Sequence, residues 1–267
     1  NLRFIGKKKL FFATSILLVI SAVGVFLSKG LNYGIDFQGG IMIDIRTQGP
    51  ADLGSLRSQL SELDLGEVSL QEFGQPDNVL IRVQRQDGGE EAQQIALAKI
   101  KKVLGSGIEY RRTEFVGPKV SEELFWDGVK AVCWAILAIL VYIWFRFEWQ
   151  FGFGAIVALL HDVLTTIGIF ALLGLEFNLS TVAAILTIAG YSINDTVVVY
   201  DRVRENLRKF KKLDLPELLN NSINQTLSRT VMTSVTTLLA LFALYFLGGD
   251  VIRDFSFAMI WGVLIGT

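Results

Sequence analysis

Cysteine, histidine and proline are scarce in this chain of 267 residues. The sequence has one cysteine, Cys133, one histidine, His161, and four prolines. A single cysteine cannot form a disulfide within the chain, and with one histidine it cannot build a thiolate or imidazole metal cluster. These shortages exclude a disulfide-stapled secreted domain and a His-rich metal site, and we expect no cofactor.

An excess of charge of one sign is also missing. Lysine and arginine number 25, aspartate and glutamate 26, and the formal net charge is −1. The basic residues gather in short patches at the ends of apolar runs, not along a face that could follow a phosphate backbone. Nucleic acid is therefore not expected as a partner.

Long apolar runs are what the sequence does have. Its apolar fraction is 51% and its mean hydropathy +0.46, above the level of an ordinary soluble domain. A helix needs about 20 mostly apolar residues to cross a ~30 Å hydrocarbon core. The apolar runs are 10–27, 126–145, 151–174, 179–200, 231–247 and a sixth that begins at Phe255. The sequence therefore predicts a membrane α-helical bundle of six spans that contacts membrane lipid.

The first and last runs lie near the ends of the sequence. Run 10–27 follows three lysines, as in a signal peptide, but no small-residue cleavage site follows it. We expect it to be retained as span 1. The thirteen residues from Phe255 to Thr267 cover about 20 Å of the ~30 Å core, so we expect span 6 to be cut short.

Basic residues near the span ends predict the orientation, because they are held on the cytoplasmic side. With six spans, the basic loops all fall on one side: Arg3, Lys7, Lys8 and Lys9; Arg146; and Arg202, Arg204, Arg208, Lys209, Lys211, Lys212 and Arg229. The opposite short loops carry only Arg253. Both termini are therefore expected in the cytoplasm, and segment 30–118 outside it. Trp126, Trp144 and Trp149 fall at span ends, as interfacial aromatics do.

Segment 30–118 differs from the rest, because short strand-like and helix-like patterns alternate in it between glycine-rich breaks. Strands are predicted at 41–45, 68–73, 79–83 and 108–115, and helices at 52–63 and 90–104. The order strand, helix, strand, strand, helix, strand is that of a ferredoxin-like βαββαβ domain. The expected organisation is span 1 in 1–29, an α+β external domain in 30–118, and spans 2 to 6 in 119–267.

The cytoplasmic linker 201–229 carries its own helical pattern. After Pro216, which can start a helix, apolar residues recur at helical spacing: Leu218, Leu219, Ile223 and Leu227. The pattern is that of an amphipathic helix along the membrane face. A plain connector remains the alternative.

Ionisable and amide side chains inside the spans are the candidate functional residues: His161 and Asp162 in span 3, Asn194 and Asp195 in span 4, and Arg229 at the start of span 5. A charge at the centre of a membrane helix costs about 2.5 to 3.5 kcal/mol on insertion scales, so such residues usually face the bundle interior. Asp195 lies about 9 Å and Asp162 about 16 Å from the cytoplasmic boundary. The depths overlap, and the long Arg229 side chain can reach toward a carboxylate.

These residues are typical of a proton relay. Desolvation favours the protonated carboxyl and a nearby arginine favours the ionised one, so small movements can load or release a proton. A static ion pair of Asp195 with Arg229 is the structural alternative. For His161 and Asp162 the alternative is a helix-to-helix hydrogen bond, and Gly190 with Asn194 suggests close packing.

Four motifs carry a resemblance to a known family: Gly-Ile-Asp-Phe-Gln-Gly-Gly (34–40), Glu-Phe-Val-Gly-Pro-Lys-Val-Ser (114–121), Ala-Gly-Tyr-Ser-Ile-Asn-Asp-Thr-Val-Val-Val-Tyr-Asp-Arg (189–202) and Asn-Gln-Thr-Leu-Ser-Arg-Thr (224–230). Over nearly its whole length the chain resembles the SecD/SecF family of bacterial protein-export membrane proteins, in the RND superfamily.

The resemblance implies a subunit in the bacterial cytoplasmic (inner) membrane that works with SecD and YajC beside the SecYEG channel. Such a subunit uses the proton motive force to help an unfolded preprotein emerge. By motif, Asp195 matches the essential intramembrane carboxylate and Arg229 the span 5 arginine. Relay residues supplied by SecD cannot be placed on this sequence.

Three other functions are compatible with parts of the pattern. An RND-type exporter of small amphiphiles would share the relay, but it usually carries larger paired external domains. An aspartyl protease could pair Asp162 with Asp195, although the Gly-x-Gly-Asp pattern of those enzymes is missing, so we do not expect an enzyme. A purely structural scaffold would need Asp195 for stability alone.

Overall fold

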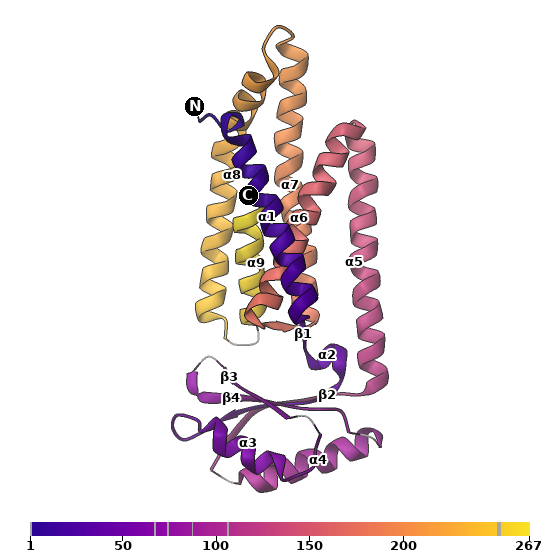
Figure 1. The fold of residues 1–267 in the computed structure, drawn as a ribbon, viewed down its shortest axis with the longest axis vertical. Coiled ribbons are helices and arrows are strands. Elements are labelled where there is room, and N and C mark those ends of the chain that lie inside the picture. The colour runs from indigo at the N-terminus through magenta and orange to yellow at the C-terminus, as the bar shows by residue number, and fades with distance from the viewer. Residues whose placement is uncertain (1, 67, 74, 87, 106, 250–251) are drawn as a thin grey trace. The chain divides into compact units, whose positions relative to one another are not determined.

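The computed structural model describes residues 2–66, 68–73, 75–86, 88–105, 107–249 and 252–267. It divides into two compact units (Figure 1). Asn1–Asn32 and Ala131–Thr267 form one, which we call the helical unit, and Tyr33–Lys130 form the other, the sheet domain. The sheet domain corresponds to the predicted segment 30–118 and also includes the first turns of the helix that follows it.

Helices form over all six apolar runs. They are α1 (Lys8–Lys29, preceded by the 3-10 helix η1, Ile5–Lys7), α5 (Pro118–Arg146), α6 (Trp149–Leu173), α7 (Leu179–Lys209), α8 (Leu215–Leu247) and α9 (Arg253–Gly266). Among the described residues, five helices are long and apolar enough to cross a membrane. The sixth, α9, has 14 residues, so a sixth span stays a prediction.

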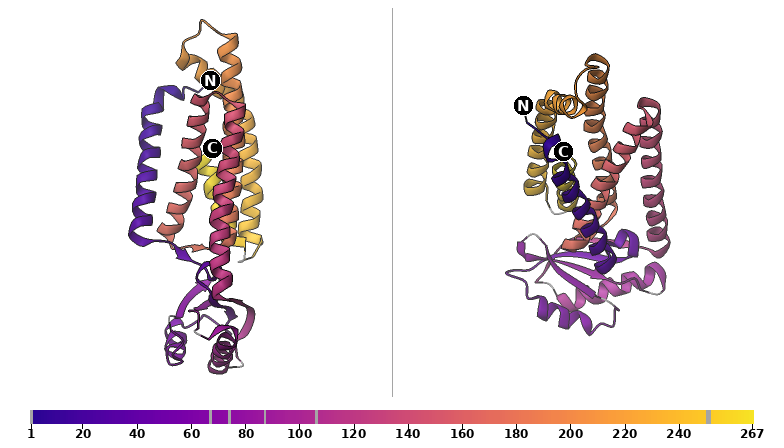
Figure 2. Two further views of the ribbon diagram at one scale, coloured as in Figure 1. Left: turned by 90° about the vertical axis from the view of Figure 1, so that its right-hand side faces the viewer. Right: turned by 45° about the horizontal axis from the view of Figure 1, so that its top comes forward.

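Helix α7 is the centre of the helical unit, where it packs against α6, α8 and α9 (Figures 1 and 2). The core of the four helices includes Phe170, Ile188 and Val263, each at most 1% exposed. The chain turns from α6 into α7 through Gly174, which takes a left-handed conformation. A capping box then starts α7, in which the Asn178 side chain accepts from the Thr181 amide. Two short strands adjoin these helices in the chain: β6 (Glu176–Phe177) in this turn and β1 (Asn32–Tyr33) after α1.

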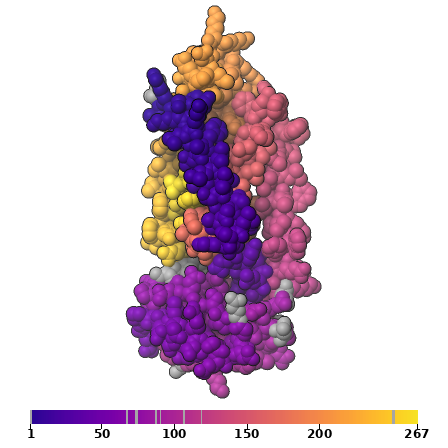
Figure 3. Space-filling view, viewed as in Figure 1, coloured from indigo at the N-terminus to yellow at the C-terminus, as the bar shows by residue number. Residues whose placement is uncertain are grey.

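Helix α1 lies on the surface of the helical unit and packs against α6 (Figure 3). At their closest approach, a Cβ added to Gly168 would lie 2.2 Å from the Ala22 Cβ. Glycine is therefore required at this crossing. The prediction of close packing at Gly190 is wrong, because a Cβ there would meet no atom of the described residues within 4 Å.

The linker helix expected along the membrane face is instead the beginning of α8. Residues 215–229 continue into span 5 without a break. Leu218, 2% exposed, is buried against the protein. A helix therefore forms over this pattern, but as the first turns of α8 and not as a separate helix. Its position along the membrane face stays a prediction.

The sheet domain has the predicted element order. Its elements are β2 (Gly40–Arg46), α3 (Leu53–Ser61), β3 (Val68–Phe73), β4 (Gln75–Val83), α4 (Gly89–Leu104) and β5 (Glu109–Val116). The strands form an antiparallel sheet in the order β3-β4-β2-β5. Ile43 in β2 pairs with Ile81 in β4 and with Thr113 in β5.

The two faces of this sheet are covered differently. Helices α3 and α4 cover one face (Figure 1), where Ile41, Ile43 and Ile45 point into the main core. On the other face, Met42 packs with Ile35 of α2 (Ile35–Gln38), a short helix that the sequence pattern did not predict. Gly40, at φ +125°, follows it, and a Cβ there would lie 2.5 Å from the Val83 carbonyl oxygen. This close approach explains why the motif at 34–40 ends in glycine.

An ion pair in the sheet domain predicts a pH dependence of local stability. Arg46 Nε donates to Asp77 Oδ2 at 2.7 Å, and this hydrogen bond holds the pKa of the Asp77 carboxyl below its ordinary value. A carboxyl with a lowered folded-state pKa stabilises the fold above its unfolded pKa, near 4, and this stabilisation is lost as the pH falls through the folded pKa. We expect Asp77→Asn to lower hydrogen-exchange protection of the Thr47 amide, which donates to the Asp77 carbonyl at 2.8 Å, at pH 6.

At a pH below the folded-state pKa of Asp77, the Asp77→Asn variant and the unchanged protein should converge. Comparing them at the same pH cancels the intrinsic pH dependence of exchange. Glu72→Gln, which changes an exposed carboxylate on the neighbouring strand, is the matched control and should have no such effect. A deficit of Asp77→Asn that is equal at both pH values would contradict the prediction.

Candidate functional site

A stripe of hydroxyl side chains runs along one side of α8. Ser222, Thr226, Thr230 and Ser234 follow at intervals of four residues, and each is at most 8% exposed. This interval places them on one face of the helix. Three of them bond to Asn206, Asp195 and Tyr191 of α7. We call these three α7–α8 contacts the polar seam.

Asp195 occupies the middle of the polar seam. Its side chain is half-buried, and Thr230 Oγ1 donates to its Oδ1 at 2.7 Å. One turn away, the Tyr191 hydroxyl donates to Ser234 Oγ at 3.2 Å, and Ser234 donates to Thr267 Oγ1 at 3.1 Å. A hydroxyl both donates and accepts, so Thr230 can hold Asp195 as a carboxylate or as a carboxylic acid.

Asp162 lies at a junction of α6, α7 and α9. It is 3% exposed, and its Oδ2 accepts from Ser192 Oγ of α7 at 2.5 Å. A Cβ added to Gly266 of α9 would lie 2.9 Å from the same oxygen. The glycine therefore lets α9 come close to this carboxyl.

His161 stands beside Asp162 on α6, and its Nδ1 lies 2.9 Å from Asp162 Oδ1. Which of the two atoms carries the proton depends on the tautomer and protonation state. The other ring nitrogen, Nε2, is buried and has no hydrogen-bond partner within the described part of the chain. The histidine can therefore exchange a proton with Asp162 on one side and still has an unused position on the other.

The two aspartates connect through α7 and not directly. Ser192, the partner of Asp162, is three residues before Asp195, so one turn of α7 contacts both sites. No hydrogen bond joins Asp162 to Asp195 among the residues that the structure describes. The carboxyl pair required by the protease hypothesis is therefore not formed.

Arg229 and Asn194, both expected near the relay, are exposed. Arg229 precedes Thr230 by one residue, which turns it about 100° away from the face that meets α7. Within the described ranges, Arg229 forms no ion pair and Asn194 no side-chain hydrogen bond. The expected reach of Arg229 toward Asp195 is not seen, and a hydroxyl takes that place.

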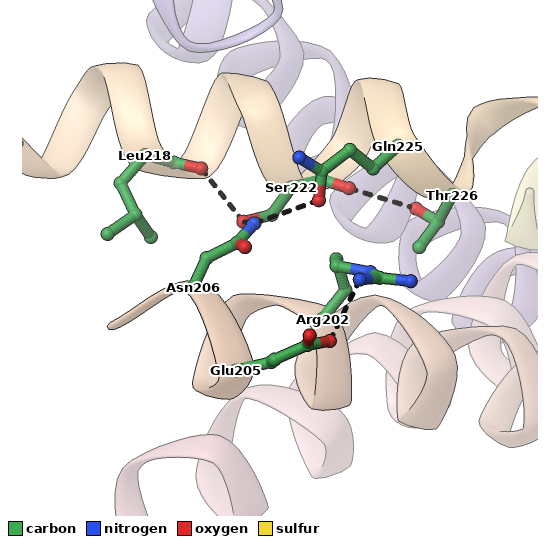
Figure 4. Close-up of polar contacts among 7 residues, drawn as sticks. All are labelled: Arg202, Glu205, Asn206, Leu218, Ser222, Gln225 and Thr226. Carbon is green, nitrogen blue, oxygen red and sulfur yellow. Dashed lines mark hydrogen bonds and ion pairs between the residues drawn. The ribbon is translucent and has the colours of Figure 1, made fainter. Parts of the chain in front are cut away.

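At the end of the polar seam nearest the C-terminus of α7, beyond the apolar run, lies an amide contact (Figure 4). Asn206, 3% exposed, donates through Nδ2 to Ser222 Oγ at 2.8 Å and to Gln225 Oε1 at 3.1 Å. Ser222 Oγ in turn donates to the Leu218 carbonyl at 2.8 Å. The contact fixes the register of α7 against α8, and therefore the position of Asp195 relative to Thr230.

Asn206→Ala is expected to lower the free energy of unfolding by about 1 to 2 kcal/mol, because it removes the two hydrogen bonds that this buried amide donates from α7 to α8. Unfolding of the detergent-solubilised chain measures this loss. Arg202→Gln is the control, since it removes an exposed pair with Glu205 one turn away (Figure 4) and should change stability by about 0.5 kcal/mol or less. Equal losses in the two variants would count against a fixed register at Asn206.

Sequence reasoning missed the partners of the carboxyls. Ser192 and the α8 stripe are uncharged and common in membrane helices, so they do not stand out individually. Their repeat at intervals of four, next to a helix with an aspartate, is the signal that could have found them. In the described residues, no group of three or more His, Cys, Asp or Glu side chains could hold a metal ion.

Two protein-family models together match most of the chain. Residues 96–267 match the model described as protein export membrane protein SecD/SecF, C-terminal. Residues 24–51 match the SecD/SecF GG motif, which contains Gly39 and Gly40.

Individual relatives are similar over nearly the full length. Protein translocase subunit SecF of Rickettsia rickettsii is 46% identical over 272 residues, covering 99% of this chain and 86% of that protein. The SecF subunit of Rhodobacter capsulatus is 48% identical over 271 residues, covering 96% and 81%.

Two crystal structures of SecDF also cover the whole chain. That of SecDF, a translocon-associated membrane protein from Thermus thermophilus, has a TM-score of 0.90 at 41% identity, and SecDF in a super-membrane-facing form has 0.70 at 40%. The chain spans 37% of either SecDF chain.

Proposed function

The chain belongs to the SecD/SecF family, as a SecF-type subunit of the Sec protein-translocation machinery, and from that premise we propose that it uses the proton motive force to promote export. Together with SecD, it would help unfolded preproteins through the SecYEG channel. The observation that carries this proposal is the half-buried Asp195, held between two membrane helices by a hydroxyl. Transport, and not catalysis, is the activity that we assign.

Proton exchange at Asp195 is the proposed energy-coupling step. A buried carboxylate needs hydrogen-bond donors, whereas a neutral carboxyl group does not require them to the same degree. Thr230 can serve both forms by reversing the direction of its hydrogen bond. Gain or loss of the proton therefore changes how strongly α7 is held to α8, and one proton crossing 100 mV supplies about 2.3 kcal/mol.

We assign Asp162 and His161 to the same relay as its second station. Ser192 ties Asp162 to the turn of α7 that carries Asp195. A shift of α7 that follows protonation of Asp195 would stretch or shorten this 2.5 Å contact. The unpartnered Nε2 of His161 provides a position for the next proton carrier.

Arg229 and Asn194 are assigned to the surface that meets SecD. An arginine at the edge of a membrane span is costly to leave in lipid, so an exposed one calls for a partner. Because Arg229 is next to Thr230 in α8, a carboxylate of SecD bound to it would lie one residue from the threonine that holds Asp195. YajC and SecYEG are proposed as further partners on the resemblance alone.

We place the protein in the bacterial inner membrane with six spans, α9 forming the sixth, and with both termini in the cytoplasm. The clustering of basic residues at one set of helix ends supports this orientation. The sheet domain then lies outside the cytoplasm. Its element order, with the strand order β3-β4-β2-β5, supports a ferredoxin-like class.

The edge strand β5 is the surface that we propose for the preprotein. Residues Glu109–Val116 alternate between exposed and half-buried, so one face of the strand packs and the other is exposed. Because β5 ends the strand order β3-β4-β2-β5, its outer edge pairs with no other strand of the described sheet. An unfolded segment can add to such an edge through backbone hydrogen bonds, which are largely independent of its sequence.

Reconstitution with purified SecD and SecYEG tests the proposed function. A proton gradient should increase the fraction of preprotein that completes translocation when this chain is present, and have little effect when it is omitted. An equal effect of the gradient without the chain would rule the proposal out. Gradient-driven uptake of a fluorescent amphiphile into the same vesicles, without an effect on preprotein, would favour a small-molecule exporter.

A further inference from the structure

A basic cleft lies at the C-terminal end of α7, on residues that the polar seam does not use, and it has no part in the proposed export function. Its volume is about 490 Å³, and its lining residues are Arg146, Asp201, Arg204, Glu205, Arg208 and Lys209. Four cations and two carboxylates give the lining a net charge of +2.

Both carboxylates of the cleft already have partners. Asp201 Oδ2 accepts from Arg146 Nη2 at 2.5 Å, and Glu205 Oε2 accepts from Arg202 Nη1 at 2.8 Å. The remaining cations, Arg204, Arg208 and Lys209, have no ion pair within the described part of the chain. The cleft is therefore complementary to an anion.

Arg204 adds a more specific indication. Its Nη1 donates to the Arg146 carbonyl oxygen at 3.4 Å, a contact between the end of α5 and α7. Its Nε is buried and finds no partner among the residues described. A buried guanidinium N–H without an acceptor is unfavourable, and a phosphate oxygen is one of the acceptors that match the donor geometry of arginine.

Three large aromatic side chains indicate the level of the cleft relative to the membrane. Trp144 is 78% exposed, Phe145 86% and Trp149 73%, and they flank Arg146 at the turn from α5 to α6. Tryptophan is enriched at the level of the lipid head groups in membrane proteins. The cleft therefore opens where phospholipid phosphates are concentrated, and a soluble anion would have to compete with them.

We propose that this cleft binds the phosphate group of an anionic phospholipid, with Arg204, Arg208 and Lys209 as its ligands. Basic pockets between helices at the membrane surface recognise such head groups in other membrane proteins. The bound lipid would also join the end of α5 to α7, adding to the contact that Arg204 makes with Arg146.

Native mass spectrometry of the full chain with phosphatidylglycerol or phosphatidylcholine tests the site. Arg208→Gln/Lys209→Gln changes two exposed residues, so it should fold, and we expect about tenfold weaker binding of phosphatidylglycerol. Lys211→Gln/Lys212→Gln removes the same charge just beyond the cleft and should bind within about twofold of the unchanged chain. Arg204→Gln, which removes the buried donor, should weaken binding as well.

Three outcomes would overturn the proposal. Equal losses in the two double variants would indicate diffuse electrostatic attraction. Unchanged binding by Arg208→Gln/Lys209→Gln would place the lipid elsewhere. Displacement of the lipid by millimolar inorganic phosphate would identify a site for a soluble anion. The measurement needs neither SecD nor SecYEG, so its failure would leave the proposed export function untouched.

Discussion

Replacing Asp195 with Asn is expected to abolish the stimulation of translocation by a proton gradient and to leave the protein folded. Asparagine has nearly the same shape and can still accept the Thr230 hydroxyl, but it cannot take up a proton. One proton crossing 100 mV is worth about 2.3 kcal/mol, which corresponds to more than a tenfold factor in an equilibrium. Completion of preprotein translocation in vesicles with SecD and SecYEG, with and without the gradient, measures the loss.

A matched pair of threonine variants separates proton coupling from stability. Thr230→Val removes the hydroxyl that holds Asp195, whereas Thr233→Val makes the same change at an exposed position where the hydroxyl donates to its own helix. We expect Thr230→Val to weaken the gradient effect and Thr233→Val to retain it, at equal amounts of protein in the membrane. Full stimulation of Asp195→Asn by the gradient would exclude Asp195 from the relay.

Replacing Gly168 with Leu is expected to separate α1 from α6 and to prevent stable folding of the helical unit. Even a methyl group at Gly168 would lie 2.2 Å from the Ala22 Cβ and 2.5 Å from its Cα, so the backbones themselves must move apart. Overpacking a tight contact costs about 1 to 3 kcal/mol for added methylenes, and leucine adds more than that. The expected result is a large loss of folded, monodisperse protein in detergent.

Two further glycine variants provide the comparison. Gly190→Leu changes a position on α7 where a Cβ would meet no atom within 4 Å in the part of the chain that the structure describes, so it should be tolerated. Gly168→Ala should show an intermediate loss of stability, measured as the free energy of unfolding. If Gly168→Leu and Gly190→Leu retain equal amounts of folded protein, the close α1–α6 crossing is not present in solution.

Much of the fold could be predicted because its signals are local. Apolar runs predicted where helices form, since the length needed to cross a membrane does not depend on neighbouring helices. Alternation of apolar residues predicted the four strands to within a few residues, because Ile41, Ile43 and Ile45 must all point to one side of the sheet. The short helix at Ile35–Gln38 has no such period and was missed.

The candidate site was predicted in part. Asp162 and Asp195 could be found from the sequence because a carboxyl inside an apolar run is costly and needs a reason. Their hydrogen-bond partners could not be predicted, because those partners depend on which face each helix turns toward its neighbours. Arg229 and Thr230 are neighbours in the sequence, yet one is exposed and the other buried against α7.

The sequence by itself determined that this is a membrane protein with an inserted α+β domain and with two carboxyls in its spans. Composition and period suffice for these conclusions, since each depends on the transfer of side chains between water and an apolar medium. The tertiary structure alone decided that Thr230 and Ser192, and not Arg229, hold those carboxyls, and that α1 crosses α6 at Gly168. The physical reason is that helix rotation and register are set by packing between segments far apart in the chain, which no local pattern records.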